Sequence, residues 1–136
     1  MSAVAEQELK FSYAKARLAE LERVRYVYLA AETGMPQRDI ARAMHMSQAG
    51  VHRMIAKAKV TGVSESLEEF VLQRHIGQID TAEMMNRLGS FEQWVPRVVD
   101  LVDGVLPGGS EEELESLLDD GFLTEEELDR IVAAHE

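Results

Sequence analysis

The chain has 136 residues, 46% of them hydrophobic, so it is long enough to bury a core of its own. It contains no cysteine, which excludes disulfides, thiol catalysis and cysteine-based zinc sites and is expected of a cytoplasmic protein. The net charge of -11 is divided unevenly: ten basic and six acidic residues give +4 over 1–62, while four basic and nineteen acidic residues give -15 over 63–136. Three prolines, nine glycines and the lack of alternating β-branched runs predict an all-α fold.

Apolar residues recur at helical spacing in the first part of the chain. They are Leu18, Leu21, Val24, Val27, Tyr28 and Ala31. This pattern predicts one helix over residues 3–32, or two with a bend, with residues 5–16 as a candidate dimerisation segment. We expect Phe11, Tyr13 and Tyr26 in a core or an interface. No basic segment followed by an apolar core opens the chain and no apolar run approaches membrane-spanning length, so neither a signal peptide nor a membrane span is predicted.

Residues 34–59 have the spacing of two short helices that cross at a tight turn. The residues expected to face inward are Ile40, Met44, Met46, Val51 and Met54. Ala41 is small, as a close helix crossing requires, and Val51 follows it by ten residues. These offsets are those of a helix-turn-helix.

The predicted boundaries agree with this pattern. Pro36 suits a first helical position, and His45 falls where the first helix should end in a left-handed turn. Ser47 is a good N-cap for the second helix, and Gly62 is a plausible stop just beyond it.

The polar face of the second helix is predicted to contact DNA. Four residues near its start are expected to read base edges in the major groove: Gln48, Ala49, His52 and Arg53. Five are expected to contact phosphates: Gln37 through its backbone, Arg38, Ser47 beside its capping role, Lys57 and Lys59.

Residues 18–58 resemble helix-turn-helix DNA-binding proteins, in particular the sigma-factor-like branch. In that branch an apolar helix like LAELERVRYVYLAA leads into a segment like GMPQRDIARAMHMSQAGVHRMIAKA, with Gly usual at the turn where this chain has His45. The resemblance implies binding of double-stranded DNA, and the alternative is an ordinary helical pair with a solvated basic face. Because one recognition helix buries little surface, we expect a homodimer.

A weak internal echo at an offset of 44 residues relates SLEEFVLQRHIGQIDTAEMMNRL to EEELESLLDDGFLTEEELDRIVAA. Each copy reads as a helix, a glycine turn (Gly77, Gly121) and a second helix with a capping box. The two predicted boxes are Asp80 with Glu83 and Thr124 with Glu127. A third box, Ser110 with Glu113, is predicted to start a helix through Leu118.

Between the copies, SFEQWVPRVVDLVDG is apolar on one face and predicts a helix that Pro96 opens or kinks. Its apolar residues could form a small core or an exposed anchor for a protein partner. They are Trp94, Val98, Leu101 and Val102.

The prediction is a helix-turn-helix DNA-binding domain over 1–62 and an acidic all-helical module for dimerisation or partner binding over 63–136. The acidic helices resemble those that end bacterial regulators. That resemblance admits an antitoxin whose acidic half neutralises a toxin while its other half regulates the operon. It also admits a free-standing repressor whose acidic half stiffens a dimer, senses a signal or shields the basic face. The alternative to these functions is that the acidic residues only stabilise the starts of helices and keep the protein in solution.

Enzyme activity is not expected from this sequence. The four histidines do not fall at a metal-binding spacing such as His-Glu-x-x-His, and no glycine-rich phosphate loop is present. No cofactor and no metal are therefore predicted, and the expected function is a sequence-specific transcriptional regulator, most simply a repressor.

Overall fold

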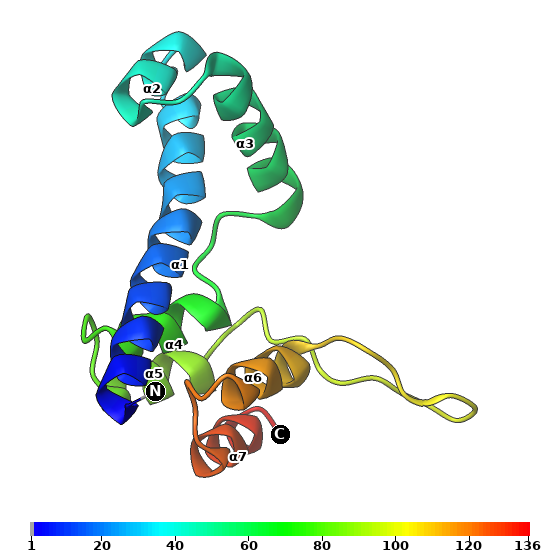
Figure 1. Cartoon of the computed structure of the whole chain (residues 1–136). Helices are drawn as coiled ribbons and strands as arrows, with labels where there is room; N and C mark the ends of the chain where they lie inside the picture. The colour runs from blue at the N-terminus through cyan, green and yellow to red at the C-terminus, as the bar shows by residue number, and fades with distance from the viewer. Residues whose placement is uncertain (1) are drawn as a thin grey trace. The chain divides into compact units, whose positions relative to one another are not determined.

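Seven α-helices and one two-stranded sheet are found in residues 2–136, which a computed structural model describes (Figure 1). The predicted all-α fold is confirmed, with 67% of the residues in helices. The elements are α1 (Ala3–Glu32), α2 (Gln37–Met44), α3 (Gln48–Thr61), α4 (Leu67–His75), α5 (Thr81–Gly89), β1 (Val99–Asp100), β2 (Gly104–Val105), α6 (Ser110–Asp119) and α7 (Glu125–Ala134). None of the helices described is long and apolar enough to cross a membrane.

Contacts divide the chain into two compact units. One is Ala16–Glu65, called here the helix-turn-helix unit; the other, called the acidic unit, joins the described residues up to Lys15 with Ser66–Glu136. The sequence-based boundary lies at residue 62 and assigns the start of α1 to the motif, whereas contacts group that start with the acidic unit. Eight basic and five acidic residues give the helix-turn-helix unit a charge of +3, and six basic and twenty acidic residues give the acidic unit -14.

The helix-turn-helix unit has a small apolar core between α1, α2 and α3. Its buried members are Val27, Ile40, Ala41, Val51 and Ile55. The predicted inward residues Met44, Met46 and Met54 pack against this cluster while staying partly exposed. Sequence analysis missed Ile55, although it follows Val51 by four residues and so shares its face of α3.

In the acidic unit two helical hairpins, α4–α5 and α6–α7, pack so that α4 contacts α6 and α5 contacts α7. The predicted repeat is confirmed by equivalent backbone hydrogen bonds 44 residues apart: Gln78 N–H donates to the Gln73 carbonyl, and Phe122 N–H donates to the Leu117 carbonyl, both at 2.9 Å. Gly77 and Gly121 share a positive φ of 83° and 84°, which favours glycine at both turns.

The three predicted capping boxes have different outcomes. The box of Thr124 with Glu127 is complete. Asp80 accepts the Glu83 N–H at 2.8 Å, but the Glu83 carboxylate binds Arg87 at 2.7 Å, so this box is half formed. The box at Ser110 is wrong: Ser110 is the first residue of α6, and its hydroxyl accepts the Val95 N–H at 2.7 Å.

The helix predicted around Pro96 is also wrong, since this segment is an extended β-hairpin. Val99 pairs with Val105 and Asp100 with Gly104 in antiparallel register. β-branched valines favour strands, and the residue before a proline avoids the helical region. The Asp100 carboxylate accepts the N–H groups of Val102 (2.7 Å) and Asp103 (3.0 Å), which closes the turn.

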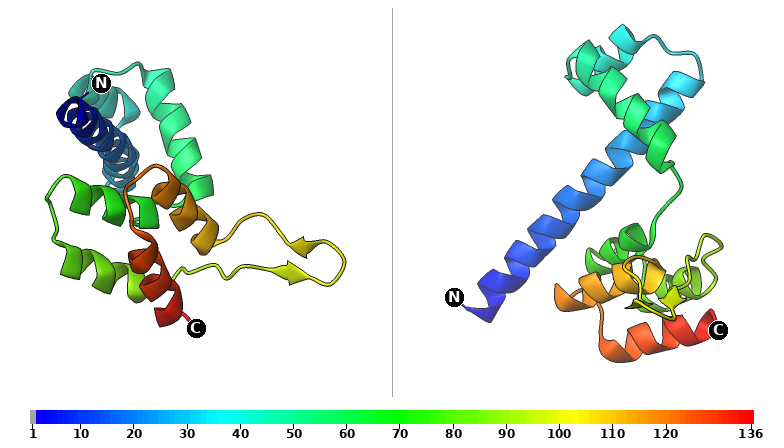
Figure 2. Two further views of the ribbon diagram at one scale, coloured as in Figure 1. Left: turned by 60° about the horizontal axis from the view of Figure 1, so that its bottom comes forward. Right: turned by 90° about the vertical axis from the view of Figure 1, so that its right-hand side faces the viewer.

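We call residues 95–106 the arm, because Figure 1 and Figure 2 show them projecting from the helices of the acidic unit. Of the two alternatives expected there, the small core is wrong, since Val98, Leu101 and Val102 are 56%, 103% and 90% exposed; the exposed anchor for a partner stays a prediction. Trp94 precedes the arm, is half-buried and stacks on His135 at 3.9 Å between ring centroids.

The aromatic residues of α1 were expected in a core or an interface; the core is wrong, and the interface stays a prediction. Phe11, Tyr13 and Tyr26 are all exposed. Within the acidic unit Tyr13 stacks on Phe122 at 5.9 Å between centroids, so its ring covers a neighbour while remaining open to solvent.

Candidate nucleic-acid interface

The turn between α2 and α3 is short and is closed by two backbone hydrogen bonds. His45 is left-handed, with φ 53° and ψ 43°, as predicted. Its N–H donates to the Arg42 carbonyl at 3.3 Å, and the Met46 N–H donates to the Ala41 carbonyl at 2.9 Å. These bonds satisfy two of the last four carbonyls of α2 and fix the path of the chain into α3.

The start of α3 is fixed by the predicted N-cap. The Ser47 hydroxyl accepts the Gly50 N–H at 3.0 Å. A Cβ at Gly50 would lie only 3.0 Å from that hydroxyl and 3.4 Å from the Met46 methyl carbon, so glycine leaves room for the cap. Sequence analysis missed this role of Gly50, which only the close approach of Ser47 shows.

The other predicted boundaries hold with one small shift. Pro36 is the N-cap of α2 and not its first helical residue as predicted, so the helix begins one residue later, at Gln37. The Pro36 carbonyl accepts the N–H groups of Asp39 and Ile40 at 3.0 and 3.1 Å. Gly62 ends α3 with φ 85°, and its N–H donates to the Ala58 carbonyl at 2.8 Å, as predicted. Beyond it, Arg25 Nε donates to the Val63 carbonyl at 2.8 Å, which ties the chain after α3 to α1.

One face of α3 is buried and therefore sets which face is free. Val51, Ile55 and Ala58 are its buried residues, spaced by four and three positions. At about 100° per residue, Ala49, His52, Arg53, Ala56 and Lys57 lie on the opposite side, and all five are exposed. We call these five residues the outer stripe of α3.

Eight of the nine residues predicted to contact DNA are exposed; the ninth, Gln37, is half-buried. By helical periodicity Gln48 and Lys59 lie at the edges of the outer stripe, nearer the packed face than Arg53. Arg38 extends from the first turn of α2 with its side chain 75% exposed, and its nearest carboxylate oxygen, on Asp39, is 3.8 Å away.

Two further residues belong with this surface. Ala56 follows Ala49 by seven residues and so extends the outer stripe. Arg42 follows Arg38 by four residues and is exposed in the last turn of α2. Helical spacing from residues already singled out would have found both.

The local charge of this surface is strongly positive. Residues 37–62 hold five basic side chains and one acidic one, a net charge of +4. The basic residues are Arg38, Arg42, Arg53, Lys57 and Lys59. Such clustering provides the attraction for phosphates that a nucleic-acid interface needs.

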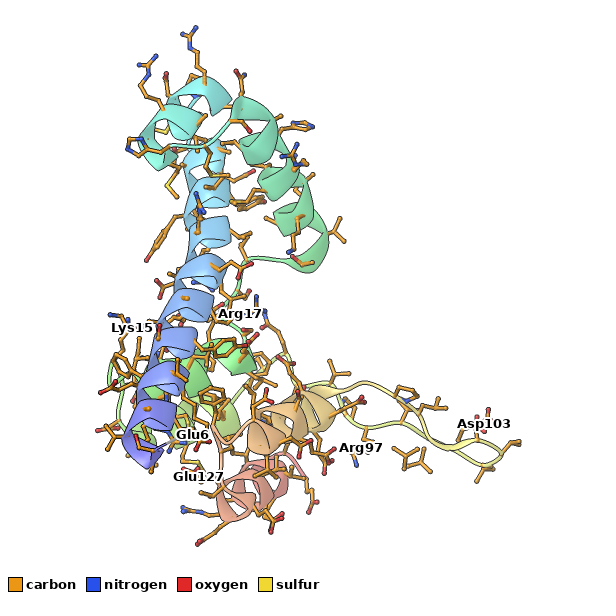
Figure 3. All side chains as sticks on the ribbon, in the orientation of Figure 1. Glu6, Lys15, Arg17, Arg97, Asp103 and Glu127 are labelled. Atoms are coloured by element: carbon orange, nitrogen blue, oxygen red, sulfur yellow. The ribbon has the colours of Figure 1, made fainter. Side chains whose placement is uncertain are left out.

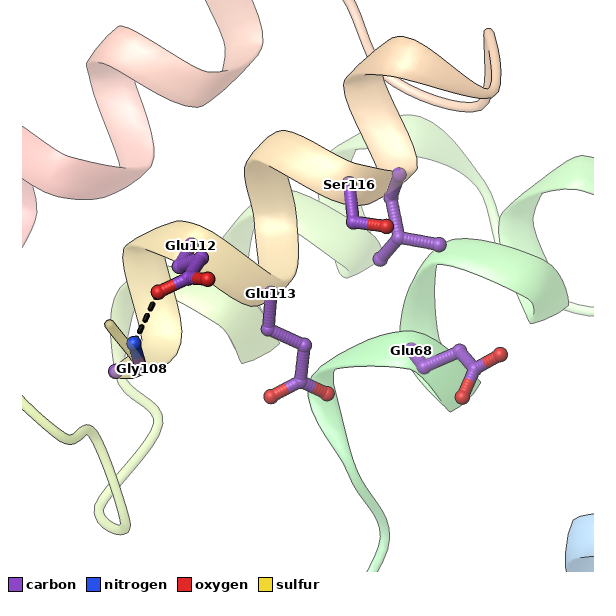
Figure 4. A pocket seen from close by; sticks show the side chains of 7 residues that line it. Glu68, Gly108, Glu112, Glu113 and Ser116 are labelled. Carbon is purple, nitrogen blue, oxygen red and sulfur yellow. Dashed lines mark hydrogen bonds between the residues drawn. The ribbon is translucent and has the colours of Figure 1, made fainter.

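The acidic unit has a hollow of about 390 Å³ beside the base of the arm, lined by Glu68, Glu112 and Glu113 (Figure 4). Burial raises the pKa of Glu113, and the nearby charge of Glu68 raises it further. The Glu112 carboxylate accepts the Gly108 N–H. Three carboxylates repel phosphate, so this hollow is not a nucleic-acid site.

Comparisons with protein-family models, with curated proteins and with solved structures give no match to this chain. Among residues 2–136, no group of three or more histidine, aspartate or glutamate side chains is placed to hold a metal ion.

Proposed function

We propose that this chain is a sequence-specific regulator of transcription that binds double-stranded DNA and acts as a repressor in the cytoplasm. The observation that carries the proposal is the outer stripe of α3, which follows a hydrogen-bonded left-handed turn and lies in a segment of charge +4. A rigid helix with a free, basic outer face is what major-groove recognition requires.

In the proposed complex α3 lies in the major groove. Arg53 would fork onto guanine O6 and N7, and Gln48 would pair with an adenine edge. Ala49 and Ala56 are small enough to admit the helix deeply and would contact thymine methyl groups. His52 completes the set of residues facing bases.

The remaining contacts would go to the phosphate backbone. The side chains proposed for them are Arg38, Arg42, Ser47, Lys57 and Lys59, with the backbone N–H of Gln37 at the start of α2. Bound at a promoter, the protein would exclude polymerase, and this is the simplest route from DNA binding to repression.

The test begins with selection of binding sites from random duplex DNA by the full chain, for which an enriched motif is expected. Arg53→Ala should then cost about 1–3 kcal/mol at one base position and relax the preference there. Lys57→Ala should weaken all sequences alike and lower the dependence of affinity on salt. Lys15→Ala, an exposed substitution in the acidic unit, is the control. No enriched motif, or equal sequence-blind losses for Arg53→Ala and Lys57→Ala, would contradict base reading by Arg53.

A second candidate is an antitoxin, and the charge of the acidic unit favours it. Three of its six basic side chains, Arg74, Arg87 and Arg97, already pair with carboxylates of the same unit, which leaves a strongly negative surface. Such a surface complements a basic toxin. Co-expression of the full chain with the product of a neighbouring reading frame tests this: relief of growth arrest by a stable complex supports it, and arrest without a complex contradicts it.

A further inference from the structure

The arm concentrates apolar surface that the rest of the chain leaves uncovered. Fourteen large hydrophobic side chains lie exposed in residues 2–136, and six of them belong to the arm. They are Val95, Val98, Val99, Leu101, Val102 and Val105, each at least 55% exposed. Surface of this kind, gathered in one segment, usually marks an interaction site.

The arm is also too small to hold its shape alone. Its sheet has two strands of two residues each, and Leu106 N–H bonds the Val98 carbonyl at 2.9 Å just beyond them. A two-stranded hairpin without a packed face is marginal in water. Within the described residues neither β1 nor β2 has a partner on its outer edge, and an open edge can accept another strand.

The charges on the arm are mostly satisfied within the acidic unit. Arg97, at its base (Figure 3), binds Glu115 at 2.6 Å and lies 3.7 Å from Glu111. Asp100 accepts two backbone N–H groups of the turn. Asp103 at the far end of the arm (Figure 3) is its remaining charge. The arm thus offers nearly neutral apolar surface on both faces of the hairpin, with open strand edges, and a second copy of the arm complements both features.

We propose that the arm is the interface between two copies of this chain, which pair arm to arm about a two-fold axis. The six exposed side chains supply on the order of 400 Å² of apolar surface per copy. A standard interface buries about 800 Å² per partner, of which roughly 450–500 Å² is apolar. Successive side chains of a strand point to opposite faces, so the arm supplies most of the apolar area that a stable dimer needs when the pairing covers both faces of the hairpin.

Pairing through the arms also avoids the repulsion between two acidic units of charge -14. The extended chain from Pro96 to Leu101 spans roughly 15–20 Å at about 3.3 Å per residue. This exceeds the screening length of about 8 Å at physiological salt, so the acidic helices of the two copies need not meet. The inference deepens the proposed function, because a dimer can read two half-sites. The role of the dimer rests on the proposed DNA binding, whereas the interface itself does not.

Cysteine cross-linking tests the interface directly, because the full chain contains no cysteine. Val99→Cys places a thiol on β1, and Val105→Cys places one on β2. If the β1 edges of two copies pair, Val99→Cys forms an intermolecular disulfide under mild oxidation; if the β2 edges pair, Val105→Cys does so. Val4→Cys is the matched control, since Val4 and Val99 are 65% and 67% exposed. Rapid dimer cross-linking by one arm variant is expected, and no excess over Val4→Cys for either variant overturns the proposal.

Sedimentation equilibrium of the full chain provides the second measurement. The wild type is expected to be a dimer, and Val99→Ser should raise the dimer dissociation constant by about tenfold or more, because the symmetry counts the substitution twice. Val4→Ser should leave it unchanged. A monomeric wild type overturns the proposal, even if the arm then binds a basic protein. A dimer whose dissociation constant is unchanged by Val99→Ser also overturns it.

These outcomes are separable from the proposed function. A wild type that dimerises through the arm but selects no DNA sequence would refute DNA recognition and leave the interface standing. A monomer that selects a single half-site would do the reverse.

Discussion

His45 is the only residue other than glycine with a positive φ in the described part of the chain. A left-handed conformation costs most side chains about 1–2 kcal/mol, whereas glycine adopts it freely and asparagine, aspartate and histidine adopt it more often than other residues. The cost at His45 is offset by the turn, whose N–H groups bond the Ala41 and Arg42 carbonyls near the end of α2. The left-handed conformation of this one residue thereby sets the angle between α2 and α3, and with it the direction in which the outer stripe faces.

A β-branched residue at this position should damage the turn. We expect His45→Val to destabilise the helix-turn-helix unit by about 1–2 kcal/mol, since valine tolerates φ near +53° poorly. His45→Gly should change its stability by less than about 1 kcal/mol, because relief of strain opposes greater freedom in the unfolded chain. Amide hydrogen exchange at the buried Val51 and Ile55 measures this unit alone. Equal loss of protection in both variants would mean that the imidazole, not the backbone conformation, matters.

At the scale of elements, Arg74 of α4 adds a polar link between the two helical hairpins of the acidic unit, beside their buried apolar core. Its guanidinium binds both carboxylate oxygens of Glu127 at 2.8 and 3.2 Å and donates to the Phe122 carbonyl at 2.9 Å. This joins the first hairpin to the second, and Glu127 also completes the capping box of α7. Hydrogen bonding to Arg74, ahead of other causes, lowers the pKa of Glu127.

The Arg74–Glu127 pair should make the stability of the acidic unit depend on pH. Because the pKa of Glu127 is lower in the folded protein than its usual 4.5, its contribution is present above that value and is lost as pH falls through the folded pKa. We therefore expect Glu127→Gln to lower the free energy of unfolding at neutral pH. The free energy of unfolding of this variant should also fall less steeply than that of the wild type as the pH is lowered. Urea denaturation from pH 7 to pH 3 measures this, with Glu126→Gln as the control. Parallel pH profiles for wild type and Glu127→Gln would contradict the assignment.

The elements differ in how far sequence could predict them. The turn at His45 and the two glycine hairpins were predictable because local signals, caps and helical spacing agree with the packing that forms. The arm was not, because Val98, Leu101 and Val102 fit one face of a helix by spacing, yet Pro96 and the Asp100 turn favour an extended chain. Periodicity also could not show that the Ser110 hydroxyl accepts a hydrogen bond from the Val95 N–H and not from an N–H of its own helix.

At the scale of the whole molecule, opposite charges are carried by different units. The helix-turn-helix unit has a net charge of +3 and the acidic unit one of -14, so the total of -11 hides the positive charge of the helix-turn-helix unit. Many carboxylates of the acidic unit lie in first turns of helices, where they stabilise the helix ends. Their field nevertheless extends about 8–10 Å at ordinary salt and farther at low salt, so it repels DNA that comes within that distance of the acidic unit.

Neutralising exposed carboxylates of the acidic unit should therefore strengthen weak, non-specific DNA binding. The variant Glu125→Gln/Glu126→Gln/Asp129→Asn changes three exposed residues and brings the net charge from -11 to -8. We expect about two- to fivefold tighter binding to random duplex at low salt, because repulsion of the phosphates falls, and no difference at high salt, where it is screened. Fluorescence anisotropy across a salt series measures both. Since Glu125 and Glu126 lie in the first turn of α7, circular dichroism must show the helix intact. Unchanged affinity at low salt with an intact fold would mean that the acidic unit exerts no field on the bound DNA, and that its charge serves the helix ends or a protein partner instead.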